Sequence, residues 1–143
     1  MIDDAIVKVQ THALLVAYNS SGNKTVRSAP SYPVEDAAVL PLTVTYISEG
    51  SMGGGDVTSA RLFSTINADF HVSRSVMKSA YMQLNIIIPD FLRRVAGDPT
   101  LGATVDTIVF PITFTVGPAV WDSVVTQMVS FQIPIKILST PTT

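Results

Sequence analysis

Two histidines, His12 and His71, are the first residues to consider for chemistry, because imidazole serves both as a metal ligand and as a general base. Neither has a Cys, a second His or a carboxylate at ligand spacing, so the sequence predicts no metal site. His71 shares an alternating segment with Asn67 and Asp69, which predicts that the three side chains lie on one face of a strand. They are the best candidates for a polar site, although such residues more often form a strand's solvated face.

Covalent and acid–base catalysis find little support elsewhere in the chain. There is no cysteine, so thiolate chemistry and disulfides are excluded, and no G-x-S-x-G motif occurs. The carboxylate pairs Asp3-Asp4 and Glu35-Asp36 are explained by helix capping and by solvation of a connector. A carboxylate pair brought together by the fold stays open at this point. We therefore expect no enzyme activity and no cofactor.

One glycine cluster, Gly53-Gly54-Gly55-Asp56, lacks the following Lys and Ser or Thr of a phosphate-binding loop. It lies within residues 48–60, between two predicted strands, and this stretch is longer than a hairpin requires. Two interpretations are equally supported: a flexible hairpin loop, or a loop that becomes ordered on assembly. Trp121, in a turn region after Gly117-Pro118, is a candidate interface anchor or a cover for the core.

Composition favours a surface that is used for contact. The 143 residues fit a single domain, 1–143, and are 47% hydrophobic but only 14% charged, with a net charge of −2. Few charges leave surface for subunit contacts or for Ser and Thr to cover, which favours an oligomer. The scattered Lys and Arg form no basic stripe, so we expect no specific nucleic-acid recognition. No apolar run reaches the roughly 18 residues of a membrane span, and the acidic start is unlike a signal peptide, which predicts synthesis in the cytoplasm.

Four segments alternate between apolar and polar residues, which is typical of half-buried strands. Their ranges are 40–47, 62–72, 107–116 and 126–138. The predicted core faces are Leu40, Leu42, Val44 and Tyr46; Ile66, Ala68, Phe70 and Val72; Ile108, Phe110, Ile112, Phe114 and Val116; Val129, Phe131, Ile133, Ile135 and Ile137. Pro41, Pro111 and Pro134 fall on the opposite faces, which predicts edge positions or bulges at these points.

Two segments show helical spacing, residues 3–17 and 75–96. We expect Asp3 or Asp4 to cap the first, and Ser73 or Ser75 to cap the second. Gly97 predicts the end of the second helix, and Pro89 predicts a kink or a split near Ile86. Residues 19–38 are predicted to form an extended connector. The fold class predicted is α+β, with an antiparallel sheet of about four strands and both helices packed on one face.

Several stretches resemble the tail terminator proteins of long-tailed bacteriophages. They are Tyr32-Pro-Val-Glu35 leading into Leu40-Pro-Leu-Thr-Val-Thr-Tyr46, the glycine loop before Ile66-Asn-Ala-Asp-Phe70, the helix through Leu92, Asp98-Pro-Thr-Leu-Gly-Ala-Thr-Val-Asp-Thr-Ile108, and Phe131-Gln-Ile-Pro-Ile-Lys136. The most telling stretch is Asp98–Ile108, directly after the helix. Together these stretches span most of the chain, but no single residue defines such families, so no functional residue is carried over.

The resemblance implies a virion protein that forms a ring of its own copies, a hexamer, on the end of the tail tube. Such a ring stops tube polymerisation and presents a surface to the head connector, so the tube and connector proteins are the implied partners. The protein would assemble in the host cytoplasm and end in the neck of the virion. Two alternatives stay open: another phage neck, head–tail joining or decoration protein, and a small ligand-binding module.

Overall fold

The computed structural model describes residues 2–16, 42–54, 60–121 and 124–139. Within these ranges two helices, α1 (Ile2–Leu14) and α2 (Met77–Ala96), accompany one five-stranded sheet. The strands are β1 (Leu42–Gly54), β2 (Ala60–Ser73), β3 (Thr107–Ile108), β4 (Thr113–Trp121) and β5 (Val124–Ser139). This confirms the predicted α+β class. The predicted connector at 19–38 and the position of Pro41 lie outside the described residues.

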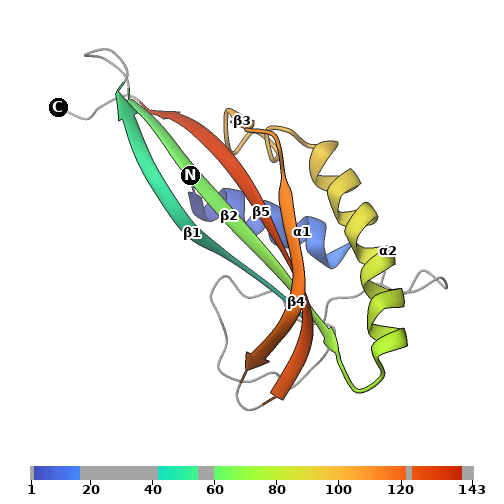
Figure 1. Cartoon of the computed structure of the whole chain (residues 1–143). Coiled ribbons are helices and arrows are strands. Elements are labelled where there is room, and N and C mark those ends of the chain that lie inside the picture. Colours follow the sequence, from blue (N-terminus) through green and yellow to red (C-terminus); the bar gives the residue numbers. More distant parts are fainter. Residues whose placement is uncertain (1, 17–41, 55–59, 122–123, 140–143) are drawn as a thin grey trace.

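Every strand pair in the sheet is antiparallel. The order is β1-β2-β5-β3, and β4 also pairs with β5. Since one side of β5 is taken by β2, both β3 and β4 lie along its other side, one after the other. Figure 1 shows the sheet as a long twisted ribbon, with α1 behind it and α2 alongside it.

The strand predicted at 107–116 is two short strands rather than one. Pro111, whose nitrogen carries no hydrogen, lies in the break between β3 and β4. Pro134 lies opposite the same break: the Val109 N–H donates to the Pro134 carbonyl at 2.8 Å. Because the N and O of one residue point to the same side of an antiparallel strand, the missing donor of Pro134 faces the break. An interior strand therefore tolerates this proline without a bulge.

The hydrophobic core lies between the helices and one face of the sheet, which we call the helix face. Its strand residues alternate as predicted in β2, from Ile66 to Val72, and in β5, from Val129 to Ile137. Phe91 of α2 packs against both strands, with ring centroids 4.9 Å from Phe70 and 4.7 Å from Phe131. Burial of these rings supplies a large share of the core's apolar area.

The predicted face of β1 is wrong. Thr43 and Thr45 pair with Phe70 and Ala68, so the two threonines point to the helix face and are fully buried. Val44 pairs with Asp69 and points to the opposite face, although it is also buried. Alternation shows which residues of a strand share a face, but it does not show which face meets the helices. From Thr43 to Thr45, residues on both faces of β1 are buried.

The helix ends also differ from the prediction. Helix α1 begins at Ile2, so Asp3 and Asp4 lie in its first turn rather than before it. Val76 precedes α2 and makes no side-chain capping hydrogen bond, so neither Ser73 nor Ser75 caps this helix. Pro89 does not split α2, which continues to Ala96, and Gly97 ends it as predicted. Leu14, one of the apolar residues at helical spacing within 3–17, is exposed.

Candidate assembly surfaces

Asn67, Asp69 and His71 share one face of β2, as predicted. They pair with Gln132, Ser130 and Met128 of β5, on the side of the sheet away from the helices, which we call the polar face. The predicted solvated strand face is only partly confirmed, because Asp69 and His71 are buried and Asn67 is half-buried. The polar face is therefore not an ordinary wet surface at these residues.

Asp69 is held by hydroxyl groups from the strands on both sides. Tyr46 of β1 donates to its Oδ2 at 2.7 Å, and Ser130 of β5 donates to its Oδ1 at 2.5 Å. Burial, together with the bond to the Asp69 carboxylate and its negative charge, raises the pKa of Tyr46 to about 12. Both carboxylate oxygens are thus occupied inside the sheet, which favours a structural role for Asp69.

The hydrogen bonds continue from Ser130 across the polar face. Gln132 donates to Ser130 Oγ at 3.0 Å and accepts from the Thr113 hydroxyl at 3.0 Å. At the other side, Ser48 donates to Asn67 Oδ1 at 2.7 Å. Asp69, one of the three residues that the sequence offered as a polar site, therefore belongs to a ladder that joins β1, β2, β5 and β4, and Asn67 makes a separate bond to β1. Satisfied networks of this kind make a structure more rigid and help to specify it.

His71 joins this face through a different bond, between its Nδ1 and the hydroxyl of the buried Thr126 at 2.9 Å. Burial lowers the pKa of His71, and the nearby Asp69 charge offsets part of that effect. The imidazole is therefore neutral at pH 7. Among the described residues, no group of three His, Cys, Asp or Glu side chains could hold a metal ion.

The glycine loop is shorter than predicted. Strand β1 extends to Gly54, where Gly53 and Gly54 pair with Arg61 and Ala60 of β2. The bounds 48–60 for a flexible loop are therefore wrong, because Ser48 to Gly54 belong to the strand. Gly55 and Asp56 lie outside the described residues. Trp121 is the last residue of β4 and pairs with Val124.

Strand β4 is an edge of the sheet with an apolar strip that sequence reasoning missed. No residue of the described chain pairs with its outer side, and its sequence Thr113–Trp121 carries no charge. Phe114, Val116 and Val120 point to the helix face but lie beyond the cover of the helices, and are 44%, 41% and 75% exposed. Natural edge strands usually carry charges, bulges or covering segments that prevent pairing. An uncharged, apolar edge therefore indicates a strand that is covered in an assembly.

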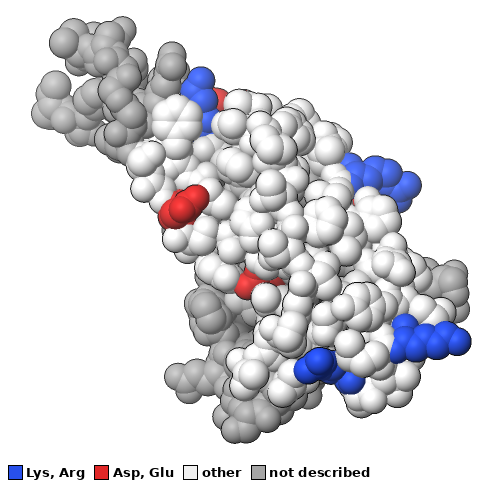
Figure 2. Space-filling view, viewed as in Figure 1, with Lys and Arg blue, Asp and Glu red and all other residues white. Residues whose placement is uncertain are grey.

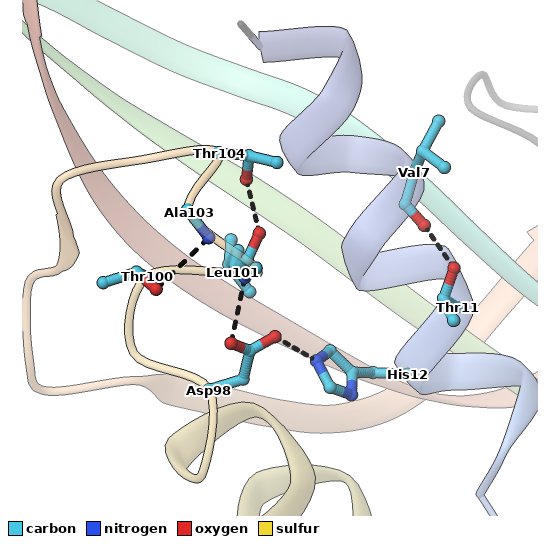
Figure 3. A network of polar contacts seen from close by, with 9 residues as sticks. Val7, Thr11, His12, Asp98, Thr100, Leu101, Ala103 and Thr104 are labelled. Carbon is cyan, nitrogen blue, oxygen red and sulfur yellow. Dashed lines mark hydrogen bonds and ion pairs between the residues drawn. The ribbon is translucent and has the colours of Figure 1, made fainter.

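A second apolar strip lies on α1. Val7 and Leu14 are 57% and 42% exposed and recur at helical spacing on one flank of the helix. The other flank meets the loop after α2, where His12 Nε2 lies 2.8 Å from Asp98 Oδ2. Figure 3 shows Val7 and His12 pointing to different sides of α1, with His12 turned towards Asp98. The strip on α1 thus faces away from this loop.

The loop from Asp98 to Thr104 fastens the end of α2 to α1. Asp98 Oδ1 accepts from the Gly102 N–H at 2.9 Å, and Leu101 is fully buried. Leu101, Gly102 and Ala103 all have positive φ, at 46°, 64° and 66°. A Cβ added at Gly102 would approach the Lys8 side chain to 3.0 Å, so glycine fits both the backbone angle and the space.

The face of the molecule seen in Figure 2 is mostly uncharged, and its Lys and Arg side chains lie at the periphery. A hollow of about 370 Å³ opens beside Glu49, Ser51, Phe63, Val109 and Pro134. None of the residues that line it belongs to α2. By register, Phe63 and Pro134 belong to the polar face, so this hollow is part of the same side of the sheet.

No family model matches the chain, and no curated protein is significantly similar to it. In the part of the chain that the structure describes, no helix is both long and apolar enough to cross a membrane.

Proposed function

We propose that this chain is a structural subunit of a phage tail terminator, which forms a ring of its own copies on the end of the tail tube. The observation that carries the proposal is the uncharged β4 edge with its exposed Phe114, Val116 and Val120. A strand of this kind is suited to lasting contact with another protein surface. The resemblance of Asp98–Ile108 and the other stretches to tail terminators supplies the identity of the assembly.

Two different edges support a ring rather than a simple dimer. The sheet ends in β1 on one side and in β4, with the short β3, on the other. Contacts between unlike surfaces join subunits head to tail, and they close into a ring when the rotation allows. A ring of six copies is what the resemblance implies, and it stops tube growth by covering the surface to which the next tube subunit would bind.

The stretch with the most telling resemblance, Asp98–Ile108, serves the fold of the subunit. It carries the contact between His12 and Asp98 and the buried Leu101, and it leads α2 into β3. Its sequence is explained by these contacts, which fix the two helices relative to each other. The surfaces that meet the tube and the head connector would then be built on a subunit whose two helices are joined by these contacts.

A non-catalytic role agrees with the chemistry of the polar face. The carboxylate of Asp69 is occupied by Tyr46 and Ser130, and the ladder continues to Gln132 and Thr113. Catalytic groups must instead present a lone pair or a proton to a substrate. We therefore assign these residues to the sheet rather than to a reaction.

The position of the chain in the particle tests this function. Phage particles are labelled with an antibody against the chain and imaged by negative-stain electron microscopy. Label confined to the junction of tail and head supports the terminator. Label on the capsid surface would assign a decoration protein instead, and particles that carry no label would remove the virion role altogether.

A further inference from the structure

We infer that neighbouring subunits join edge to edge, with β4 of one copy pairing with β1 of a second copy. This inference rests on the proposed ring and names the two surfaces that would form each joint. Both strands lie at edges of the sheet within the described chain. Pairing would give the outer backbone groups of β4 the hydrogen-bond partners that a sheet edge lacks.

Strand direction favours this joint. Each step across the sheet, from β1 to β2, β5 and β4, reverses the direction of the chain. Strand β4 therefore runs opposite to β1. If the second copy is placed beside the first so that the two sheets continue, its β1 is antiparallel to β4. Strand directions then continue to alternate across the joint, so the new pair has the same antiparallel hydrogen-bond pattern as the other pairs in the sheet.

The apolar strips on the two edges also match. Helix α1 packs over β1, and its loop-facing flank is turned towards β3 on the far side of the sheet. The exposed strip of Val7 and Leu14 lies on the side of α1 away from that loop, and by helical spacing it faces outward from the sheet, opposite the buried Val9 and Ala13. A neighbour placed beside the free edge of β1 could therefore reach it. In the joint, this strip would lie above the exposed Phe114 and Val116 of the neighbouring β4, all on the helix face.

Few charges oppose this contact, although Asp3 and Asp4 lie in the first turn of α1. Strand β4 has no charged residue, and Glu49 is the one charged residue in the sequence of β1. On α1, Lys8 packs against Gly102 on the loop side, away from the strip. An interface core that excludes charge is typical of subunit contacts.

The size of the strips predicts how strong one joint is. Five exposed side chains, Val7, Leu14, Phe114, Val116 and Val120, cannot by themselves bury the roughly 800 Å² per partner of a standard stable interface. A single joint should therefore be weak, and two copies should associate only at high concentration. A closed ring makes one such joint per subunit and leaves no free edge, so assembly is expected to be cooperative on its template.

Single-cysteine variants test the joint directly, because the chain has no cysteine of its own. We would prepare Val116→Cys and Val7→Cys, concentrate them separately and mixed, and add a short bis-maleimide. The inference predicts a cross-linked dimer in the mixture and at least tenfold less in either variant alone. Dimers from Val116→Cys alone would show that β4 pairs with itself, and the absence of dimers in all samples would equally overturn the inference.

A charge placed in the joint gives a second readout. Val116→Lys should weaken self-association at least tenfold, since a lysine would face the neighbour's apolar strip, while the melting temperature stays near that of the parent. Met82→Lys is the matched control, because Met82 is 57% exposed and lies on the side of α2 opposite its buried residues. Equal association of the two variants would contradict the inference. If the chain caps tails but the variants do not cross-link, the β4–β1 joint is wrong and the terminator function stands. If the variants cross-link but the chain does not cap tails, the joint stands and the terminator function is wrong.

Discussion

His12 of α1 lies 2.8 Å from Asp98, the residue that follows α2 and Gly97. The same carboxylate accepts the N–H of Gly102, so one side chain ties together a helix end, a turn and a second helix (Figure 3). Burial raises the pKa of Asp98, but the bond from Gly102 and the contacts with His12 and Lys8 outweigh it, and the pKa lies below its usual value.

Asp98→Ala should therefore lower the free energy of unfolding by about 1–2 kcal/mol at pH 7, through loss of both partners. A depressed carboxyl pKa contributes stability above its unfolded value of about 3.9, and this contribution is lost as the pH falls through the folded value. The variant should thus show a smaller loss of stability on acidification than the parent. Urea unfolding at pH 7 and pH 3.5 measures both effects, and parallel losses in the two proteins would contradict the assignment.

Tyr46 should ionise near pH 12, because its hydroxyl is partly buried and donates to Asp69. A raised tyrosine pKa contributes stability that is present below about pH 10 and disappears as the pH rises towards the folded value. Ultraviolet titration of the parent against Tyr46→Phe isolates this residue from the other tyrosines. In Asp69→Asn the step should move towards pH 10, and an unchanged step would show that Asp69 is not its partner.

Thr45→Val should stabilise the protein by about 1 kcal/mol, because it removes a buried hydroxyl. Thr45 is fully buried on the helix face, and its Oγ1 has no hydrogen-bond partner among the described atoms. Thr115→Val is the control, since Thr115 is exposed on the polar face of β4, and it should change stability by less than about 0.5 kcal/mol. Destabilisation by Thr45→Val in thermal melts would mean that the hydroxyl is satisfied.

His71 should lower the stability of the protein in mild acid. Its pKa is depressed by burial, so between pH 7 and pH 5 the unfolded chain binds a proton more readily than the folded one. The free energy of unfolding therefore falls as the pH drops below about 6.5, and His71→Gln should reduce this fall. Proton NMR of the two histidine rings, assigned with His12→Gln, would refute the expectation if the His71 signal titrates at or above pH 6.5.

The sequence predicts where the helices and strands lie in the chain better than it predicts which face of each strand is covered. Regular alternation correctly places Phe70 and Phe131 in the core, because β2 and β5 lie in the interior of the sheet and one of their faces meets both helices. At the edges the same pattern fails: Thr45 faces the core from β1, and Phe114 is exposed on β4. Which face is covered there depends on the placement of α1 and α2, which a strand's own residues do not encode.

The candidate site was also predictable only in part: what one strand's own residues determine could be predicted, and what depends on other strands could not. The common face of Asn67, Asp69 and His71 follows from period two, whereas the hydroxyls of Tyr46 and Ser130 reach Asp69 through a register between distant strands. The alternation in 107–116 predicts that Phe114 and Val116 are in the core, so it does not reveal the exposed apolar strip on β4. One signal was present in the sequence: an uncharged run of fifteen residues, 107–121, ends at Trp121, and an edge strand without charges indicates a contact surface.

Electron microscopy of tail tubes that polymerise with and without the purified chain tests most directly whether the chain caps the tube and stops its growth. Tube length is measured after tube protein is added in excess, with Val116→Lys as a variant impaired in self-association. We expect the parent chain to hold the tubes at their initial length and to mark one end with a ring, and Val116→Lys to do so poorly. Tubes that elongate equally in the presence and absence of the parent chain would contradict this expectation.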